Sequence, residues 1–356
     1  MISRIKYFIA RDTDPYRNIA FEKYLTLNAA EGECVLFLWQ NQRTVVIGRN
    51  QNAWEECRIK ALQEDGGHLA RRLSGGGAVY HDLGNLNFSF AARKADYDTA
   101  KQSEVILRAV RKLGIPAERT GRNDLTADGR KFSGTAFYET RGCCCHHGTV
   151  MMDVDTKAME RYLNVSPAKL YSKGVLSVHA RVVNLKEYCP DICTEILRAT
   201  MLQSFSEVYG LPVEGLLLDC QADEAIGKEA ESLALESWLF PPRIPFTAEA
   251  SRRFAWGGIR VCLNVKQNRV ETADCWSDAM DGQLICAVRD ALPGCAYDGD
   301  ALAARVKEAA LLNADDLNSL PLRHKMAAEI SELLRELVLG QASEDICPAD
   351  ENERTL

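Results

Sequence analysis

The stretch that says most about the fold reads Arg71-Arg72-Leu73-Ser74-Gly75-Gly76-Gly77-Ala78-Val79-Tyr80-His81-Asp82. Its three consecutive glycines lie between runs typical of strands, although glycine weakens a strand because it loses backbone entropy and has no side chain to pack. A functional cause would be close approach to a ligand, with bare N–H groups turned toward an anion. The two arginines could add charge-assisted contacts to phosphate or carboxylate. A plain tight turn with solvated arginines remains the alternative.

A second polar stretch runs Gly121-Arg122-Asn123-Asp124 and resumes, after a hairpin turn at 127–129, as Arg130-Lys131-Phe132-Ser133-Gly134. Lys131, at the head of a strand, can act as a compact positive charge on phosphate. Asp124 could hold Mg²⁺, because magnesium sites often use only one or two carboxylates. A surface hairpin with ordinary charges is the other interpretation. The sequence contains neither GxxxxGK[ST] nor GxGxxG, so a P-loop and a dinucleotide fingerprint have no support.

The run Cys143-Cys144-Cys145-His146-His147 suggests metal binding at first sight. Zinc sites space their ligands, however, and five adjacent residues of a strand alternate between opposite faces and cannot converge on one ion. The pattern therefore disfavours a metal site. A different function for this run, a nucleophilic cysteine activated by a neighbouring histidine, remains an alternative. The chain has 13 cysteines, an odd number that indicates thiols in a reducing compartment rather than a disulfide framework.

Composition narrows the class of protein. The chain has 356 residues, 46% of them hydrophobic and 26% charged. At about 150 residues per domain, this length predicts two domains. The net charge of −7 argues against a nonspecific nucleic-acid binder. No apolar run reaches the roughly 18–20 residues of a membrane helix, and the first ten residues lack a signal-peptide pattern, so we expect a cytoplasmic protein that does not engage a membrane.

The pattern of elements predicts an α+β fold, because strands and helices do not alternate regularly. Prolines at 241, 242 and 245 mark the expected boundary between residues 1–246 and 247–340, followed by an acidic, disordered tail at 341–356. The pattern further predicts a hairpin of residues 34–40 and 44–49, one helix from 52 to about 64, and a strand over 254–265 paired with 269–276. Helices are expected at 281–292, 299–312 and 313–339.

In this order the stretches resemble the lipoate–protein ligase A family. The resemblance covers roughly residues 2–335 and departs from the family at Leu73, in a shorter turn at 127–129, at the three cysteines and in the acidic tail. It rests on the glycine stretch extended to Asn85 and on the following blocks: Val35–Trp39, Val45–Arg49, Gln51-Asn52, Gly121–Asp124, Arg130–Ala136, His146–Thr149, Ser172–Val175, Ser177-Val178, Arg181–Leu185 and Arg253–Gly258.

The resemblance implies a mixed sheet with flanking helices, as in biotin–protein ligases, plus a smaller C-terminal accessory domain. It implies an enzyme that converts lipoate and MgATP into lipoyl-adenylate and pyrophosphate. The enzyme then passes the lipoyl group to a specific lysine of a lipoyl domain on a 2-oxoacid dehydrogenase subunit or of the glycine-cleavage H protein. A monomer is expected. Whether lipoate or octanoate is preferred, and which acceptor is used, stays open.

Site residues follow from the resemblance position by position. Lys131 is the expected catalytic residue and would contact both substrates. His81, Asn123 and Asp124 are further candidates, with His81 for phosphate and Asp124 for Mg²⁺. The residues expected to bind ATP are Arg72, Gly77, Ala78, Val79, Tyr80 and Lys131. Those expected to bind lipoate are Ser74, Gly75, Gly76, Lys131, His147 and Gly148.

Two other functions remain open at this stage. The first is an octanoyl- or lipoyl-transferase of related fold, which uses a cysteine thioester and no ATP; Cys143, Cys144 and Cys145 would be its candidate nucleophiles. The second is a lipoyl-domain-binding module without catalysis. The accessory domain favours the ATP-dependent ligase over the transferase.

Overall fold

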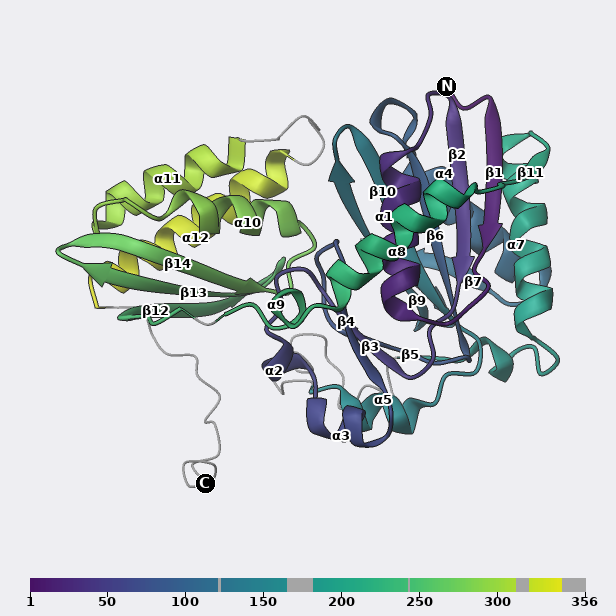
Figure 1. The fold of residues 1–356 in the computed structure, drawn as a ribbon, viewed down its shortest axis with the longest axis horizontal. Coiled ribbons are helices and arrows are strands. Elements are labelled where there is room, and N and C mark those ends of the chain that lie inside the picture. Colours follow the sequence, from purple (N-terminus) through teal and green to yellow (C-terminus); the bar gives the residue numbers. More distant parts are fainter. Residues whose placement is uncertain (121–122, 165–181, 243, 312–319, 341–356) are drawn as a thin grey trace. The chain divides into compact units, whose positions relative to one another are not determined.

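The computed structural model describes residues 1–120, 123–164, 182–242, 244–311 and 320–340. Residues 121–122, 172–175, 177–178 and 181 of the predicted motifs, residues 313–319 of the last expected helix, and the acidic tail lie outside this part. The chain divides into two compact units (Figure 1). The first comprises Met1–Gly48, Ala53–Ser74 and Ala78–Pro241, and the second comprises Arg49–Asn52, Gly75–Gly77 and Pro242–Leu356.

A large mixed sheet forms the centre of the first unit. Among the described residues it has eight strands. Strand β1 (Arg4–Ile9) pairs in parallel with both of its neighbours, whereas the pairs from β2 (Glu33–Trp39) onward, on the side away from β1, are antiparallel. Their order across the sheet is β11 (Val213–Gly215), β1 (Arg4–Ile9), β2 (Glu33–Trp39), β6 (Asn85–Arg93), β10 (Cys143–Met151), β9 (Arg130–Thr140), β8 (Asp124–Ala127) and β7 (Ala117–Thr120).

Helices cover both faces of this sheet. Helices α1 (Pro15–Leu27) and α8 (Cys220–Ala234) pack together, and Phe21 of α1 stacks on Phe37 of β2 with ring centroids 4.8 Å apart. The opposite face carries α4 (Thr99–Lys112) and α7 (Thr194–Tyr209), which bury Phe90 of β6. The alternation of side chains along a strand produces these two layers, because successive residues point to opposite faces.

A smaller sheet in the same unit contains β4 (His68–Arg71), β3 (Thr44–Ile47) and β5 (Val79–His81), in that order. The predicted hairpin of 34–40 and 44–49 is therefore wrong, since β2 and β3 lie in different sheets. The buried side chain of Asn41 explains the break: its Oδ1 accepts from Asn18 Nδ2 at 3.1 Å, and its Nδ2 lies 3.3 Å from His81 Nδ1. These tertiary bonds turn the chain out of the large sheet.

Short helices complete the first unit. The single helix expected from 52 to 64 is divided into α2 (Ala53–Glu56) and α3 (Ile59–Glu64), so that prediction is also wrong. An antiparallel bridge between Cys57 and Leu163 occupies the break. The remaining elements are η1 (Lys94–Asp96), α5 (Thr156–Tyr162), η3 (Leu185–Glu187) and α9 (Glu236–Leu239).

The second unit packs an antiparallel sheet against helices. Its strands are β12 (Ala248–Phe254), β13 (Gly257–Lys266) and β14 (Arg269–Ser277), and its helices are α10 (Gly282–Ala291), α11 (Gly299–Leu311) and α12 (Leu320–Val338). The expected strand over 254–265 is wrong at its start, because the chain reverses at 255–256. Gly257, with φ of +149°, and Gly258, whose N–H donates to Asp278 Oδ1 at 2.7 Å, stabilise this reversal.

The mixed α+β fold class expected from the sequence is confirmed, as is the presence of a separate C-terminal unit. In the part of the chain that the structure describes, no helix combines the length and apolar character needed to cross a bilayer.

Burial on β6 gives a stability prediction. Phe90 is fully buried between Phe205 and the neighbouring strands, so Phe90→Ala should lower the free energy of unfolding by about 3–5 kcal/mol. Phe137 on β9 is 48% exposed, and Phe137→Ala should change stability by only about 0.5 kcal/mol. Urea unfolding followed by circular dichroism measures both. Equal effects of the two substitutions would contradict the difference in burial between the two side chains.

Candidate functional site

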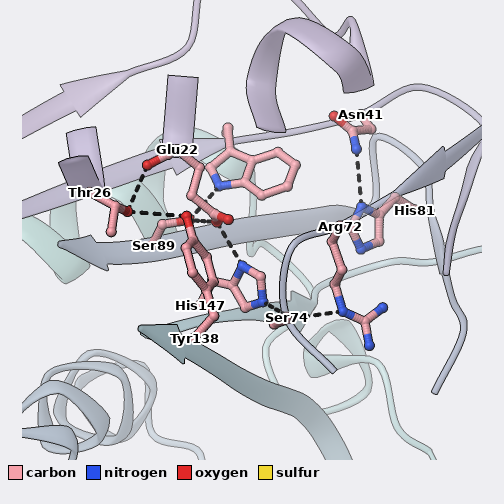
Figure 2. A network of polar contacts seen from close by, with 10 residues as sticks. Glu22, Thr26, Asn41, Arg72, Ser74, His81, Ser89, Tyr138 and His147 are labelled. Carbon is pink, nitrogen blue, oxygen red and sulfur yellow. Dashed lines mark hydrogen bonds and ion pairs between the residues drawn. The ribbon is translucent and has the colours of Figure 1, made fainter. Parts of the chain in front are cut away.

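A buried polar network lies between α1 and the large sheet, in a layer that is otherwise apolar (Figure 2). Glu22 projects from α1 toward His147 of β10, and Ser89 of β6 lies directly opposite His147 in the strand register. Ser74 and Arg72 approach from the segment that follows β4. The fold thus brings together residues from four separate stretches of the chain.

The core of the network is a row of hydrogen bonds from a carboxylate to a guanidinium. Glu22 Oε2 lies 2.7 Å from His147 Nδ1, and His147 Nε2 lies 2.7 Å from Ser74 Oγ. Arg72 Nε donates to Ser74 Oγ at 3.0 Å. All four residues are buried, with exposures of 1%, 7%, 1% and 8% in that order. The structure therefore brings together three predicted site residues: Arg72, Ser74 and His147.

The two oxygens of the Glu22 carboxylate differ in their surroundings. Oε2 also accepts a 2.5 Å hydrogen bond from Ser89 Oγ, which in turn accepts from the indole N–H of Trp39 at 3.0 Å. Oε1 is buried and has no hydrogen-bond partner. Since a buried carboxylate oxygen without a partner is costly, this atom is available to a ligand.

The two neighbouring arginines have different roles. Burial lowers the pKa of Arg72 to about 10, and the charge of Glu22 opposes that shift, so Arg72 stays a cation at neutral pH. Arg71 instead donates to main-chain carbonyls, including Trp238 O at 2.9 Å and Leu239 O at 2.7 Å. We expected both arginines to contact a phosphate or carboxylate, but the hydrogen bonds of Arg71 hold α9 against the small sheet.

Lys131 and Asp124, both predicted site residues, form an ion pair with Nζ and Oδ1 2.6 Å apart. Their side chains are 23% and 24% exposed. The ammonium lies over Gly134, where an added Cβ would be 2.6 Å from Nζ. A side chain at position 134 would therefore require the end of the Lys131 side chain to shift. Asn123 lies beside this pair, where its Nδ2 donates to Thr135 O at 3.2 Å.

The glycine bend at Gly75–Gly77 belongs to the second unit. The N–H of Gly76 donates to Ala279 O at 2.9 Å. A Cβ on Gly75 would lie 2.2 Å from the same carbonyl oxygen, which is impossible without movement of the backbone. Glycine is required here because protein main chain approaches it closely, and close approach to a ligand stays a prediction.

The remaining predicted residues lie in structured surroundings. Val79 and Tyr80 belong to β5, which pairs with β3, and the Tyr80 ring packs 5.5 Å from that of Tyr162; Ala78 precedes this strand. His81 is buried, and desolvation, with the charges of Arg72 and His147, lowers its pKa to about 3. His81 is therefore neutral and offers a phosphate no charge. Gly148 packs on Phe88, where a Cβ would lie 2.7 Å from Cζ.

Several residues of the network escaped sequence analysis, and a signal for them existed. Asn18, Glu22 and Thr26 recur every four residues on the buried side of α1. Asn85, Asn87 and Ser89 alternate along β6 with the fully buried Leu86, Phe88 and Phe90. Polar residues at helical and strand spacing on buried faces indicate a polar layer inside the core.

Comparison with known proteins places this geometry in context. A model of the lipoyl protein ligase A/B catalytic domain matches residues 14–206, and one of the bacterial lipoate protein ligase C-terminus matches residues 243–318. The P. falciparum LipL1 structure in complex with lipoate is 27% identical with a TM-score of 0.78, covering 92% of this chain and 99% of that one.

Two further solved structures cover less of the chain. A bi-partite lipoate protein ligase of Thermoplasma acidophilum, studied with its E2 lipoyl domain, is 25% identical with a TM-score of 0.60 and covers 69% of this chain and 100% of that one. A lipoate-protein ligase A bound with ATP is 24% identical with a TM-score of 0.58 and covers 67% of this chain and 98% of that one, a likeness of fold.

The burial of His81 predicts a pH dependence of stability. The unfolded chain takes up a proton near the ordinary pKa of 6.5, whereas the folded state resists protonation down to about pH 3, so stability falls as pH drops below 6.5. His81→Gln should remove about 1.2 kcal/mol of the loss between pH 7 and 5.5, as measured by urea unfolding. An unchanged slope in the His81 variant would contradict the prediction.

Replacing glycine by alanine should change the free energy of unfolding in opposite directions at positions 148 and 227. Gly148→Ala should lower the free energy of unfolding by about 1–3 kcal/mol, because the new Cβ would lie 2.7 Å from Gly134 O. Gly227 lies within α8 with nothing within 4 Å of an added Cβ, so Gly227→Ala should raise stability by up to about 1 kcal/mol. Denaturant unfolding of both variants tests the pair. A stabilising Gly148→Ala would overturn the close contact on β10.

Proposed function

Because this chain belongs to the lipoyl protein ligase A/B family, we propose that it is an ATP-dependent lipoate–protein ligase that works through lipoyl-adenylate. The observation that carries the proposal is the match to the lipoate-bound P. falciparum structure, which spans 92% of the chain and so includes both units. The match to the C-terminal family model adds to it, because the ATP-dependent form carries this domain. Under this proposal residues 1–246 are catalytic and residues 247–340 accessory.

In the first proposed step, a carboxylate oxygen of lipoate attacks the α-phosphorus of ATP, and the bond to the departing pyrophosphate breaks. In the second, the amine of an acceptor lysine attacks the carbonyl carbon of the adenylate; AMP leaves, and the amine loses a proton. Neither step needs an enzyme nucleophile, so the protein contributes positioning and electrostatic stabilisation.

Lys131 is the proposed catalytic residue. Its ammonium would offset the negative charge that grows on the α-phosphate as the carboxylate attacks. The ion pair with Asp124 supports this role, because a partly buried carboxylate holds the flexible lysine in one place before substrates arrive. Arg72 is proposed to add a second cation for ATP, together with the backbone of Gly77, Ala78, Val79 and Tyr80.

Asp124 is the proposed ligand of Mg²⁺. A single carboxylate fits the usual donor set of this ion, which takes most of its remaining ligands from phosphate and water. Magnesium would supply further neutralisation of the phosphates when bound. Because Oδ1 of Asp124 also pairs with Lys131, the carboxylate would be shared between the lysine and the ion.

For lipoate, the proposed contacts are Ser74, Gly75, Gly76, His147 and Gly148, with Lys131 at the carboxylate. The proposed acceptors are lysines of lipoyl domains and of the H protein. The T. acidophilum ligase studied with its E2 lipoyl domain supports the first of these acceptors. Octanoate shares the aliphatic acid of lipoate and remains a possible second substrate.

The cysteine-dependent transferase is the second candidate, since the matched family model covers both A and B enzymes. The surroundings of the cysteines argue against it. Cys143, Cys144 and Cys145 are all buried, and burial raises the pKa of Cys145 well above its usual range. A nucleophilic thiol needs the opposite shift, because the thiolate is the reactive form.

Lys131→Ala provides the test of the proposed chemistry. Wild-type protein should release pyrophosphate from ATP only when lipoate or octanoate is present, and Lys131→Ala should slow that release by about 100- to 1,000-fold. Lys186 pairs with Asp153 at the surface, so Lys186→Ala is the matched control and should keep wild-type activity. Pyrophosphate release is followed by a coupled assay.

Two results would reject the proposal. Pyrophosphate release that survives in Lys131→Ala would remove the role of the lysine. Transfer from an acyl carrier protein without ATP, lost when Cys143, Cys144 and Cys145 are replaced by alanine, would establish the transferase instead.

A further inference from the structure

A thiol completes the surroundings of the Glu22–His147 pair. Cys145 is two residues before His147 on β10, so both side chains point to the α1 face. A carboxylate oxygen of Glu22, Sγ of Cys145 and a ring nitrogen of His147 lie within 4.8 Å of one another, and all three residues are buried. Within the described residues, this is the group of three potential metal ligands that the fold brings together.

We propose that Glu22, Cys145 and His147 form a binding site for a divalent cation of the zinc type. Sulfur and nitrogen ligands with one carboxylate suit Zn²⁺, whereas Mg²⁺ and Ca²⁺ prefer oxygen alone. Five adjacent residues of a strand cannot share an ion, because they alternate between its two faces. Cys145 and His147 are two residues apart and lie on the same face, and Glu22 of α1 supplies the third ligand.

The unpartnered oxygen is the second observation that points to a ligand. Glu22 Oε1 is buried without a hydrogen-bond partner, while Oε2 is already held by Ser89 Oγ at 2.5 Å. A cation bound by Oε1 would satisfy the orphaned atom and leave the Ser89 contact intact. The carboxylate is thus held in place by one oxygen and available through the other.

The histidine is held by its other nitrogen. Nε2 lies 2.7 Å from Ser74 Oγ, and Nδ1 faces Glu22. When an ion occupies Nδ1, the neutral imidazole carries its single proton on Nε2 and donates it to Ser74. Such an outer hydrogen bond fixes the ring of a metal-binding histidine. Arg72, which donates to Ser74 at 3.0 Å, lies beyond this hydroxyl and not between the ligands.

Charge and geometry both fit the proposed ion. The carboxylate and a thiolate carry two negative charges, which balance the two positive charges of the ion, and the thiol proton is released to solvent. Zinc bonds of about 2.0–2.3 Å place tetrahedral ligand atoms about 3.3–3.8 Å apart. Since the three ligand atoms lie within 4.8 Å of one another, their longest separation would need to shorten by at most about 1.5 Å, and the fourth position would stay open.

Cobalt binding to the full chain tests the site without ATP or lipoate, so the result is independent of the proposed function. Chelator-treated, reduced protein is titrated with Co²⁺ without oxygen, and a near-ultraviolet thiolate-to-cobalt absorption band is followed. We expect the band in wild type to rise to one equivalent, to disappear on addition of Zn²⁺, and to be absent from Cys145→Ser.

Cys144 gives the matched control, because it is also buried on β10 but points to the opposite face of the sheet. Cys144→Ser should keep the full band. Glu22→Gln preserves the size of the side chain and the acceptor for His147, and should weaken Zn²⁺ binding by at least about tenfold in competition with a chromophoric chelator.

Circular dichroism of each variant distinguishes loss of the metal site from loss of folding. If Cys145→Ser is unfolded, the Zn²⁺ affinity of Glu22→Gln provides the test of the site. No cobalt band in wild type, an equal band in Cys145→Ser, or unchanged Zn²⁺ affinity in folded Glu22→Gln would each overturn the proposal.

Discussion

The arrangement of the first unit depends on the buried pair of Glu22 and His147, whose Oε2 and Nδ1 atoms lie 2.7 Å apart. Burial of the Glu22 carboxylate without hydrogen-bond partners would cost several kcal/mol. Helix α1 must therefore pack in the one orientation that places Glu22, and not an adjacent residue, against His147. The same demand sets the register of β6 on β10, because a slip of one residue would carry Ser89 to the opposite face. The apolar residues stabilise the layer, but this polar pair determines which of the possible packings is compatible with satisfied charges.

The two candidate cations of the first unit are both compensated before any substrate is present. Lys131 pairs directly with Asp124, and Arg72 connects to Glu22 through Ser74 and His147. A bound polyanion would therefore redistribute existing electrostatic partners instead of neutralising isolated charges. This arrangement keeps the cations in place at little cost, since isolated buried charges are expensive. It also connects the proposed nucleotide contacts of Arg72 to residues proposed for the acyl substrate.

Local sequence signals predicted most helices and strands, because the periodicity of apolar residues and the caps, such as Asp14 before α1, act over a few residues. They also singled out Arg72 and Lys131 as candidate anion contacts, whereas the proposed roles of Ser74 and His147 came from the family resemblance. They failed where distant contacts decide the structure. Asn41 leaves the large sheet because Asn18 and His81 bind it, and Glu22 joins the network because α1 packs on β10. Neither partner can be read from neighbouring residues, although the buried polar rows on α1 and β6 carried a signal.

The hydrogen bond from Gly76 to Ala279 has a consequence for the glycine bend. A peptide hydrogen makes one good hydrogen bond at a time, so the carbonyl of Ala279 and an incoming anion are rival acceptors for it. Each acceptor would reduce the binding free energy of the other by the net contribution of one hydrogen bond. That contribution is about 1 kcal/mol, or roughly a factor of five in an equilibrium constant. Under the proposed function, an anion bound at this amide would therefore weaken the attachment of the loop around residue 279, and a firmly attached loop would weaken anion binding.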